Sequence, residues 1–110
     1  MVKPKHPMVL NTGTKIYKIE QKSLSKEGLH GCVEFMKGTL SIDPNQSPED
    51  YKNTLIHEIC HIGYEMFGLG SDEEMGKTTN EFITTVTANM LHLFSTLNPE
   101  LFEYMFSESK

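Results

Sequence analysis

The spacing of hydrophobic positions changes near residue 46, from alternation to a helical repeat. Before it, runs rich in β-branched and aromatic residues are separated by Gly, Asn and Pro, as is typical of short strands joined by turns. Three runs have this composition: residues 15–21, 30–36 and 39–43. Lys37-Gly38 between the last two indicates a hairpin. We therefore predict a sheet of about three strands, preceded by an extended arm over residues 1–13.

The last of these strands is expected to have one buried face. Its apolar residues, Leu40 and Ile42, alternate with polar ones and should point into the core. The polar residues of this strand should then meet water: Thr39, Ser41 and Asp43.

A helix is predicted from residue 47 to about residue 67. Ser47 is a favourable N-cap, Pro48 suits the first helical position, and Gly68 follows the last periodic residue. Gly63, which weakens a helix, suggests that another element packs closely there. One apolar stripe is formed by Tyr51, Leu55, Ile59, Ile62 and Met66, widened by Ile56, Cys60 and Phe67. The opposite arc is polar: Asp50, Thr54, His57, Glu58, His61, Tyr64 and Glu65.

A second helix is expected to begin at the sequence Ser71-Asp72-Glu73-Glu74, which resembles a capping box. Residues 82–87 are β-branched and alone favour a strand, but the apolar spacing over a longer window favours a helix. That spacing connects Phe82, Val86, Met90, Leu93 and Leu97. A last short helix should run from Pro99 to about Phe106 and cover the core.

Composition limits the class of protein. A chain of 110 residues is long enough for one domain, which we assign to residues 1–110. The net charge of -5 argues against nucleic-acid or anionic-membrane partners. A signal peptide and a membrane-spanning segment are both lacking, so a soluble, cytoplasmic protein is expected. We interpret Cys32 and Cys60 as reduced packing residues, and His6 and His30 as surface histidines.

The chemistry of the chain is indicated by the sequence His57-Glu58-Ile59-Cys60-His61. On a helix, residues four apart share a face, so His57 and His61 can turn two imidazoles toward one zinc ion while Glu58 acts as a base. A catalytic zinc ion needs a third protein ligand. The second helix offers Glu81 and His92 on one face, and we choose Glu81.

The pair Asn80-Glu81, with Glu81 twenty residues beyond His61, resembles the gluzincin metallopeptidases, the thermolysin-type clan. The resemblance covers roughly residues 39–92 and is nearest to small ImmA/IrrE-like or minimal gluzincins, some of them phage-encoded. It implies a zincin-like α+β fold in which His57, His61 and Glu81 hold one zinc ion and Glu58 is the general base. It also implies that a peptide lies antiparallel to the edge strand above the zinc helix, which here would be residues 39–43.

The chain departs from the thermolysin-type pattern in two respects. Where those enzymes have an aspartate one turn after the ligand glutamate, this chain has Thr85. The residue that stabilises the oxyanion is left open among Tyr104, Tyr64 and His92.

Two functions follow from this pattern. The first is a zinc-dependent endopeptidase acting on an intracellular protein. The alternative is a non-catalytic, zinc-stabilised module that binds a partner along the strand at residues 39–43.

Overall fold

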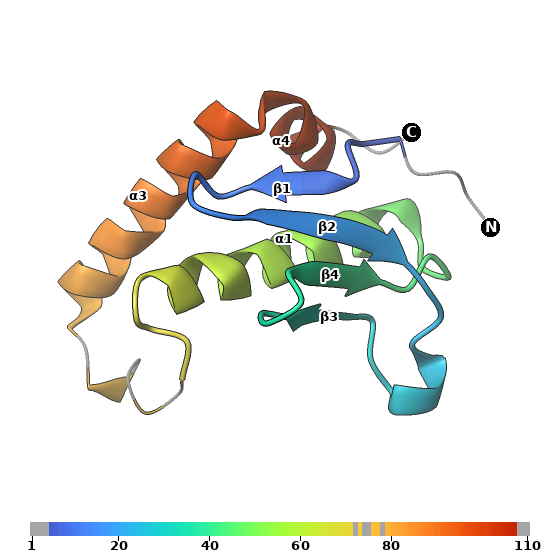
Figure 1. Cartoon of the computed structure of the whole chain (residues 1–110), viewed down its shortest axis with the longest axis horizontal. Coiled ribbons are helices and arrows are strands. Elements are labelled where there is room, and N and C mark those ends of the chain that lie inside the picture. Colours follow the sequence, from blue (N-terminus) through green and yellow to red (C-terminus); the bar gives the residue numbers. More distant parts are fainter. Residues whose placement is uncertain (1–4, 72, 74–75, 78, 108–110) are drawn as a thin grey trace.

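The computed structural model describes residues 5–71, 73, 76–77 and 79–107. These residues form an α+β fold in which a mixed sheet packs against helices (Figure 1). The strands are β1 (Val9–Asn11), β2 (Ile16–Gln21), β3 (Gly31–Glu34) and β4 (Thr39–Ile42). The helices are α1 (Pro48–Met66), α3 (Asn80–Leu97) and α4 (Pro99–Phe106), with a short 3-10 turn η1 at Ser25–Glu27.

The sheet has four strands in the order β1-β2-β4-β3, one more than predicted. The additional strand comes from the N-terminal arm, where Val9–Asn11 pair antiparallel with β2. A tight turn makes this pairing possible, because Gly13 adopts a positive φ of 92° and the Thr12 N–H donates to the Lys15 carbonyl. The predicted hairpin between β3 and β4 is confirmed.

The prediction that residues 39–43 form an edge strand is wrong. β4 lies inside the sheet, where it pairs in parallel with β2 and antiparallel with β3, so that β3 occupies the edge. The expected water-facing side of β4 is also wrong, because Ser41 is only 1% exposed and Asp43 is buried. The Asp43 carboxylate accepts hydrogen bonds from the Leu24 and Asn45 N–H groups.

Helix α1 lies behind the sheet in Figure 1 and contributes much of the core. Its first turn is capped as predicted, because the Ser47 hydroxyl accepts a hydrogen bond from the Asp50 N–H at 3.1 Å. The predicted stripe is buried as far as Ile62, whereas Met66 and Phe67 are exposed. The core contains Leu10, Tyr17, Ile19, Leu40, Ile42, Tyr51, Leu55, Ile59, Ile62, Met90, Phe94, Leu101, Phe102 and Met105.

Helix α3 confirms that residues 82–87 are helical. It begins at Asn80, with Thr79 as its N-cap. The predicted start at residue 71 depends on Asp72 and Glu74, which lie outside the described residues. Its buried face differs from the predicted stripe, since Val86, Met90 and Phe94 are buried while Phe82, Leu93 and Leu97 are exposed. Among the helices that the structure describes, we find none with the length and apolar character needed to cross a membrane.

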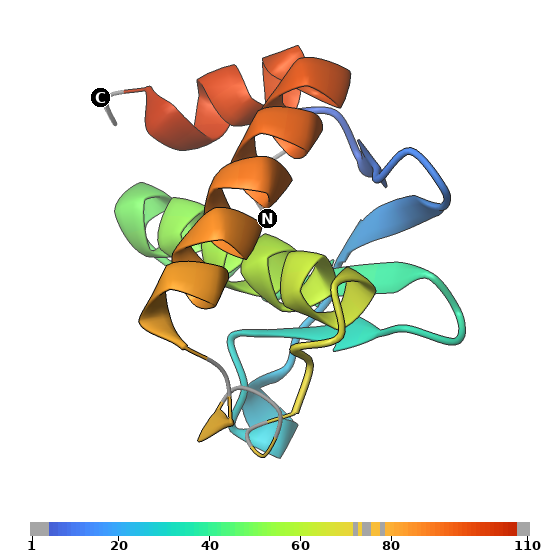
Figure 2. The ribbon, with the colours of Figure 1, turned by 90° about the vertical axis from the view of Figure 1, so that its left-hand side faces the viewer.

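Helices α1 and α3 cross, as Figure 2 shows, and Gly63 of α1 lies against Met90 of α3 at this crossing. A Cβ at position 63 would lie 1.8 Å from the Sδ atom of Met90, so the crossing requires a residue without a side chain. One residue further, the hydroxyls of Tyr64 and Thr87 lie 2.7 Å apart and join the two helices. The close approach inferred from Gly63 in the sequence is therefore confirmed.

This crossing predicts the effect of Gly63→Ala. Although alanine favours a helix, its methyl group would overlap Met90, which is fully buried and has little room to move. We expect a net loss of about 1–3 kcal/mol in the free energy of unfolding, measured by chemical denaturation. Gly76→Ala is the matched control, because no atom lies within 4 Å of a Cβ there. Equal stability of the two variants would contradict the close crossing.

Candidate metal centre

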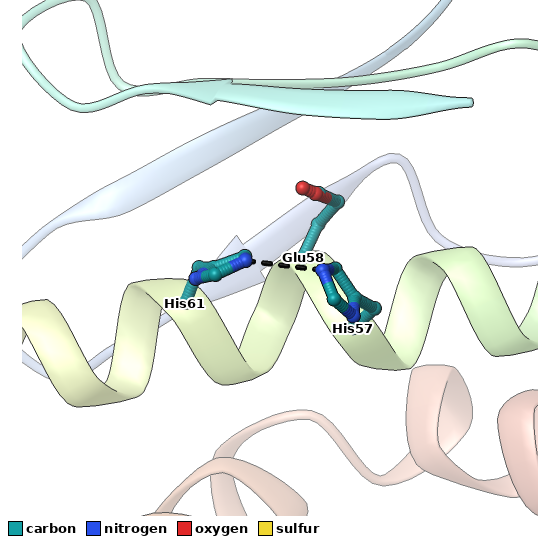
Figure 3. A group of neighbouring side chains, drawn as sticks. All are labelled: His57, Glu58 and His61. Carbon is teal, nitrogen blue, oxygen red and sulfur yellow. Dashed lines mark hydrogen bonds between the residues drawn. The ribbon is translucent and has the colours of Figure 1, made fainter. Parts of the chain in front are cut away.

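The side chains of His57 and His61 converge on one point at the surface of α1 (Figure 3). Their Nε2 atoms lie 3.1 Å apart, and both side chains are exposed. The helix places them together because they are four residues apart, while Ile59 and Ile62 hold the opposite side of α1 in the core. The pairing predicted from the sequence is therefore present.

The separation of these nitrogens is close to that of two ligands on one tetrahedral metal ion, for which zinc provides the reference lengths. With zinc–nitrogen bonds of about 2.0–2.1 Å, two ligands at a tetrahedral angle have nitrogens about 3.3–3.4 Å apart. The observed 3.1 Å differs from this by a few tenths of an ångström, which small rotations of the rings can supply. The potential ligand atoms of His57, Glu58 and His61 all lie within 4.8 Å of one another.

Glu58 differs from the two histidines in being buried, with an exposure of 6%. Its Oε2 atom has no hydrogen-bond partner among the described residues. Burial raises the pKa of Glu58, and the neighbouring His61 and His57 act in the opposite direction. A buried carboxyl group beside two imidazoles is suited to accept and release a proton.

The edge strand β3 lies directly over Glu58, a contact that was not predicted from the sequence. At Gly31, a Cβ would lie 2.8 Å from Thr54 Cγ2 and 3.0 Å from Glu58 Cγ. Gln46 joins the same elements, because its side chain accepts from the Thr54 hydroxyl and donates to the His30 carbonyl. The signal in the sequence was a glycine within a predicted strand, which often marks close backbone approach.

The proposed third ligand is not part of this cluster. Glu81 is exposed in the first turn of α3, and the group of potential ligands found among the described residues does not include it. His92, the other candidate, is also exposed on α3. The Thr85 hydroxyl, at the position where thermolysin-type enzymes have an aspartate, donates to the Glu81 carbonyl at 3.0 Å.

The candidate oxyanion donors have other contacts in this structure. Because the Thr87 hydroxyl donates to the Ile83 carbonyl, the Tyr64 hydroxyl must donate to Thr87. The Tyr104 ring lies beside the rings of His6 and Tyr51, which belong to the N-terminal arm and the start of α1. The structure thus places Tyr64 at a contact between helices and Tyr104 in an aromatic cluster.

The cysteines agree with the interpretation as packing residues. Cys32 and Cys60 are free and half-buried, and Cys60 packs against the core. Burial raises the pKa of the Cys60 thiol, which favours the protonated form over the thiolate that binds metals.

Comparisons of the chain with known protein families, with curated proteins and with solved structures found no match. The chemistry of the site is therefore inferred from three features of this chain. They are two converging imidazoles, a buried carboxyl group beside them, and an edge strand that packs against the Glu58 side chain.

The convergence of the two imidazoles predicts the metal-binding properties of histidine variants. His57→Ala and His61→Ala should each abolish stoichiometric zinc binding, because one nitrogen cannot replace two. Zinc content after dialysis and isothermal titration calorimetry measure this. His30→Ala is the control, since His30 is exposed and outside the cluster. Stoichiometric zinc in His57→Ala would show that other residues hold the metal.

Proposed function

We propose that the chain is a zinc-dependent metallopeptidase of the gluzincin type, with His57 and His61 as zinc ligands and Glu58 as general base. The observation that carries this proposal is the convergence of two exposed Nε2 atoms beside a buried carboxyl group. The position of β3 over Glu58 adds support, because peptide substrates commonly bind along a free strand edge.

We further propose Glu81 as the third ligand. The support is the Asn80-Glu81 pair twenty residues beyond His61, together with the packing of α3 on α1 two residues after His61. Glu81 is exposed, so its side chain can change rotamer without disturbing the core. Two histidines and one carboxylate form a donor set found in catalytic zinc sites.

In this proposal each group has a separate task. A bound zinc ion would polarise the scissile carbonyl and lower the pKa of the attacking water. Glu58 accepts the proton from that water and passes it to the nitrogen of the leaving amine. The side of β3 that has no strand partner among the described residues offers backbone N–H and C=O groups to an extended peptide, which is held beside Glu58.

A second candidate is a non-catalytic module that uses zinc for stability and binds a partner by strand addition. The observation that favours it is the position of Glu81 outside the cluster of His57, Glu58 and His61. The free edge for such a partner would be β3, in place of the strand at residues 39–43. The two candidates differ in their dependence on Glu58.

The peptidase proposal predicts that Glu58→Gln retains zinc and loses cleavage. Glutamine has nearly the same shape but cannot accept the proton, so the rate should fall by at least about 10²–10⁴-fold. The measurement uses zinc-loaded protein and a proteome-derived peptide library, with new N-termini identified by mass spectrometry. Glu65→Gln, on the same helix, is the matched control and should retain activity.

The same experiment separates the alternatives. Cleavage by the wild type that is lost in Glu58→Gln supports the peptidase. If neither protein cleaves and both bind zinc with equal affinity, the binding module is favoured. Equal cleavage by both proteins would exclude Glu58 as the base.

The proposed ligand set predicts that Glu81→Ala weakens zinc binding. Loss of a ligand should reduce the affinity more than the roughly 10–100-fold that loss of a supporting partner costs. Calorimetric titration of the purified variant measures this, with His92→Ala as the control. If Glu81→Ala binds zinc with unchanged affinity and His92→Ala binds it more weakly, His92 is the third zinc ligand.

A further inference from the structure

His6 is buried, which corrects the prediction of a surface histidine at this position. The side chain is 7% exposed and lies against residues of two helices, α1 and α4. Its Nε2 atom lies 2.8 Å from the Tyr51 hydroxyl of α1, and its ring centroid lies 4.8 Å from that of Tyr104 of α4. Its Nδ1 atom lies 2.8 Å from the Pro7 carbonyl oxygen. The segment before β1 is therefore attached to the start of α1 and to α4 through one imidazole.

The hydrogen bonds around His6 fit a neutral ring. Nδ1–H donates to the Pro7 carbonyl, because that oxygen can only accept. The Tyr51 oxygen accepts from the Gln21 side-chain amide at 3.1 Å, so its own hydrogen can be donated to Nε2 of His6. Protonation of Nε2 would place a second donor against this hydroxyl and remove the acceptor of its hydrogen.

The charged groups near His6 give its protonated form no ion-pair partner among the described residues. From α1, the Lys52 ammonium group lies 5.1 Å from the centroid of the Tyr104 ring that packs against His6. The phenols of Tyr51 and Tyr104 are uncharged near neutral pH, and burial raises the pKa of each further above its ordinary value near 10. Among the described residues, no carboxylate lies within salt-bridge distance of His6. Burial accordingly lowers the pKa of His6.

We propose that His6 is an acid-released clasp: protonation of its imidazole detaches residues 5–7 from Tyr51 and Tyr104 while β1 and the rest of the fold remain in place. The boundary falls at Met8, because the Met8 carbonyl accepts a hydrogen bond from the Ile19 N–H at 2.8 Å. Lys52 stays attached to α4, since its ammonium group donates to the Ser107 carbonyl and hydroxyl oxygens. This inference does not depend on the proposed enzymatic function.

The clasp predicts how stability changes with pH. The unfolded chain takes up a proton near the ordinary His pKa of 6.5, whereas the folded chain resists protonation of His6. The contribution of His6 is therefore complete above pH 6.5 and is lost as the pH falls below that value. The folding equilibrium constant should fall about tenfold for each pH unit between 6.5 and the pKa of His6 in the folded protein.

Denaturation of the full chain at several pH values tests this. His6→Gln should remove this pH dependence, because glutamine can hydrogen-bond to Tyr51 but does not titrate. His30→Gln, which changes an exposed histidine, is the matched control and should retain the dependence. If His6→Gln and the wild type show the same pH dependence, the clasp is overturned.

NMR on the wild type gives a test that requires no variant. Nuclear Overhauser effects between the rings of His6 and Tyr104 should be present near pH 8 and disappear as His6 titrates on acidification. Those between β1 and β2 should persist across the same range. Ring contacts that survive protonation of His6, or a His6 that remains neutral until the whole chain unfolds, would overturn the proposal.

Discussion

The arrangement of this protein depends on the packing of α1 between the sheet and α3. Leu55 and Ile62 are fully buried, and each such side chain contributes about 1.5–3 kcal/mol when it leaves water. Gly63 lets α3 approach the same helix closely. With these sides occupied, the arc that carries His57 and His61 remains exposed to solvent. The packing that stabilises α1 therefore also determines which of its residues can meet a metal ion or a substrate.

The topology of the sheet determines the surroundings of Glu58. Because β4 pairs in parallel with β2, the chain must cross over between them, and the crossing segment contains β3. β3 then returns as the antiparallel partner of β4 at the sheet edge, with Gly31 against Glu58. A single arrangement thus buries the carboxyl group, raises its pKa and brings a free strand edge beside it.

Some interactions join parts of the chain that are far apart in sequence, and these interactions were not predicted. His6 and Tyr51 are separated by 45 positions, and Asn11 pairs with Asn98 across 87 positions. Such contacts have no periodic signal, because each depends on a single side chain reaching a single partner. The burial of His6 and the addition of β1 to the sheet belong to this class.

The sequence by itself determined the features that depend on neighbouring residues. The N-cap at Ser47, the helical course of residues 82–87 and the shared face of His57 and His61 follow from local hydrogen bonding and a period of 3.6 residues. Only the tertiary structure decided that β4 is an interior strand, that β3 covers Glu58 and that His6 is buried. The reason is physical: strand order and burial are set by contacts between distant segments, which compete for the same core and cannot be read from local spacing.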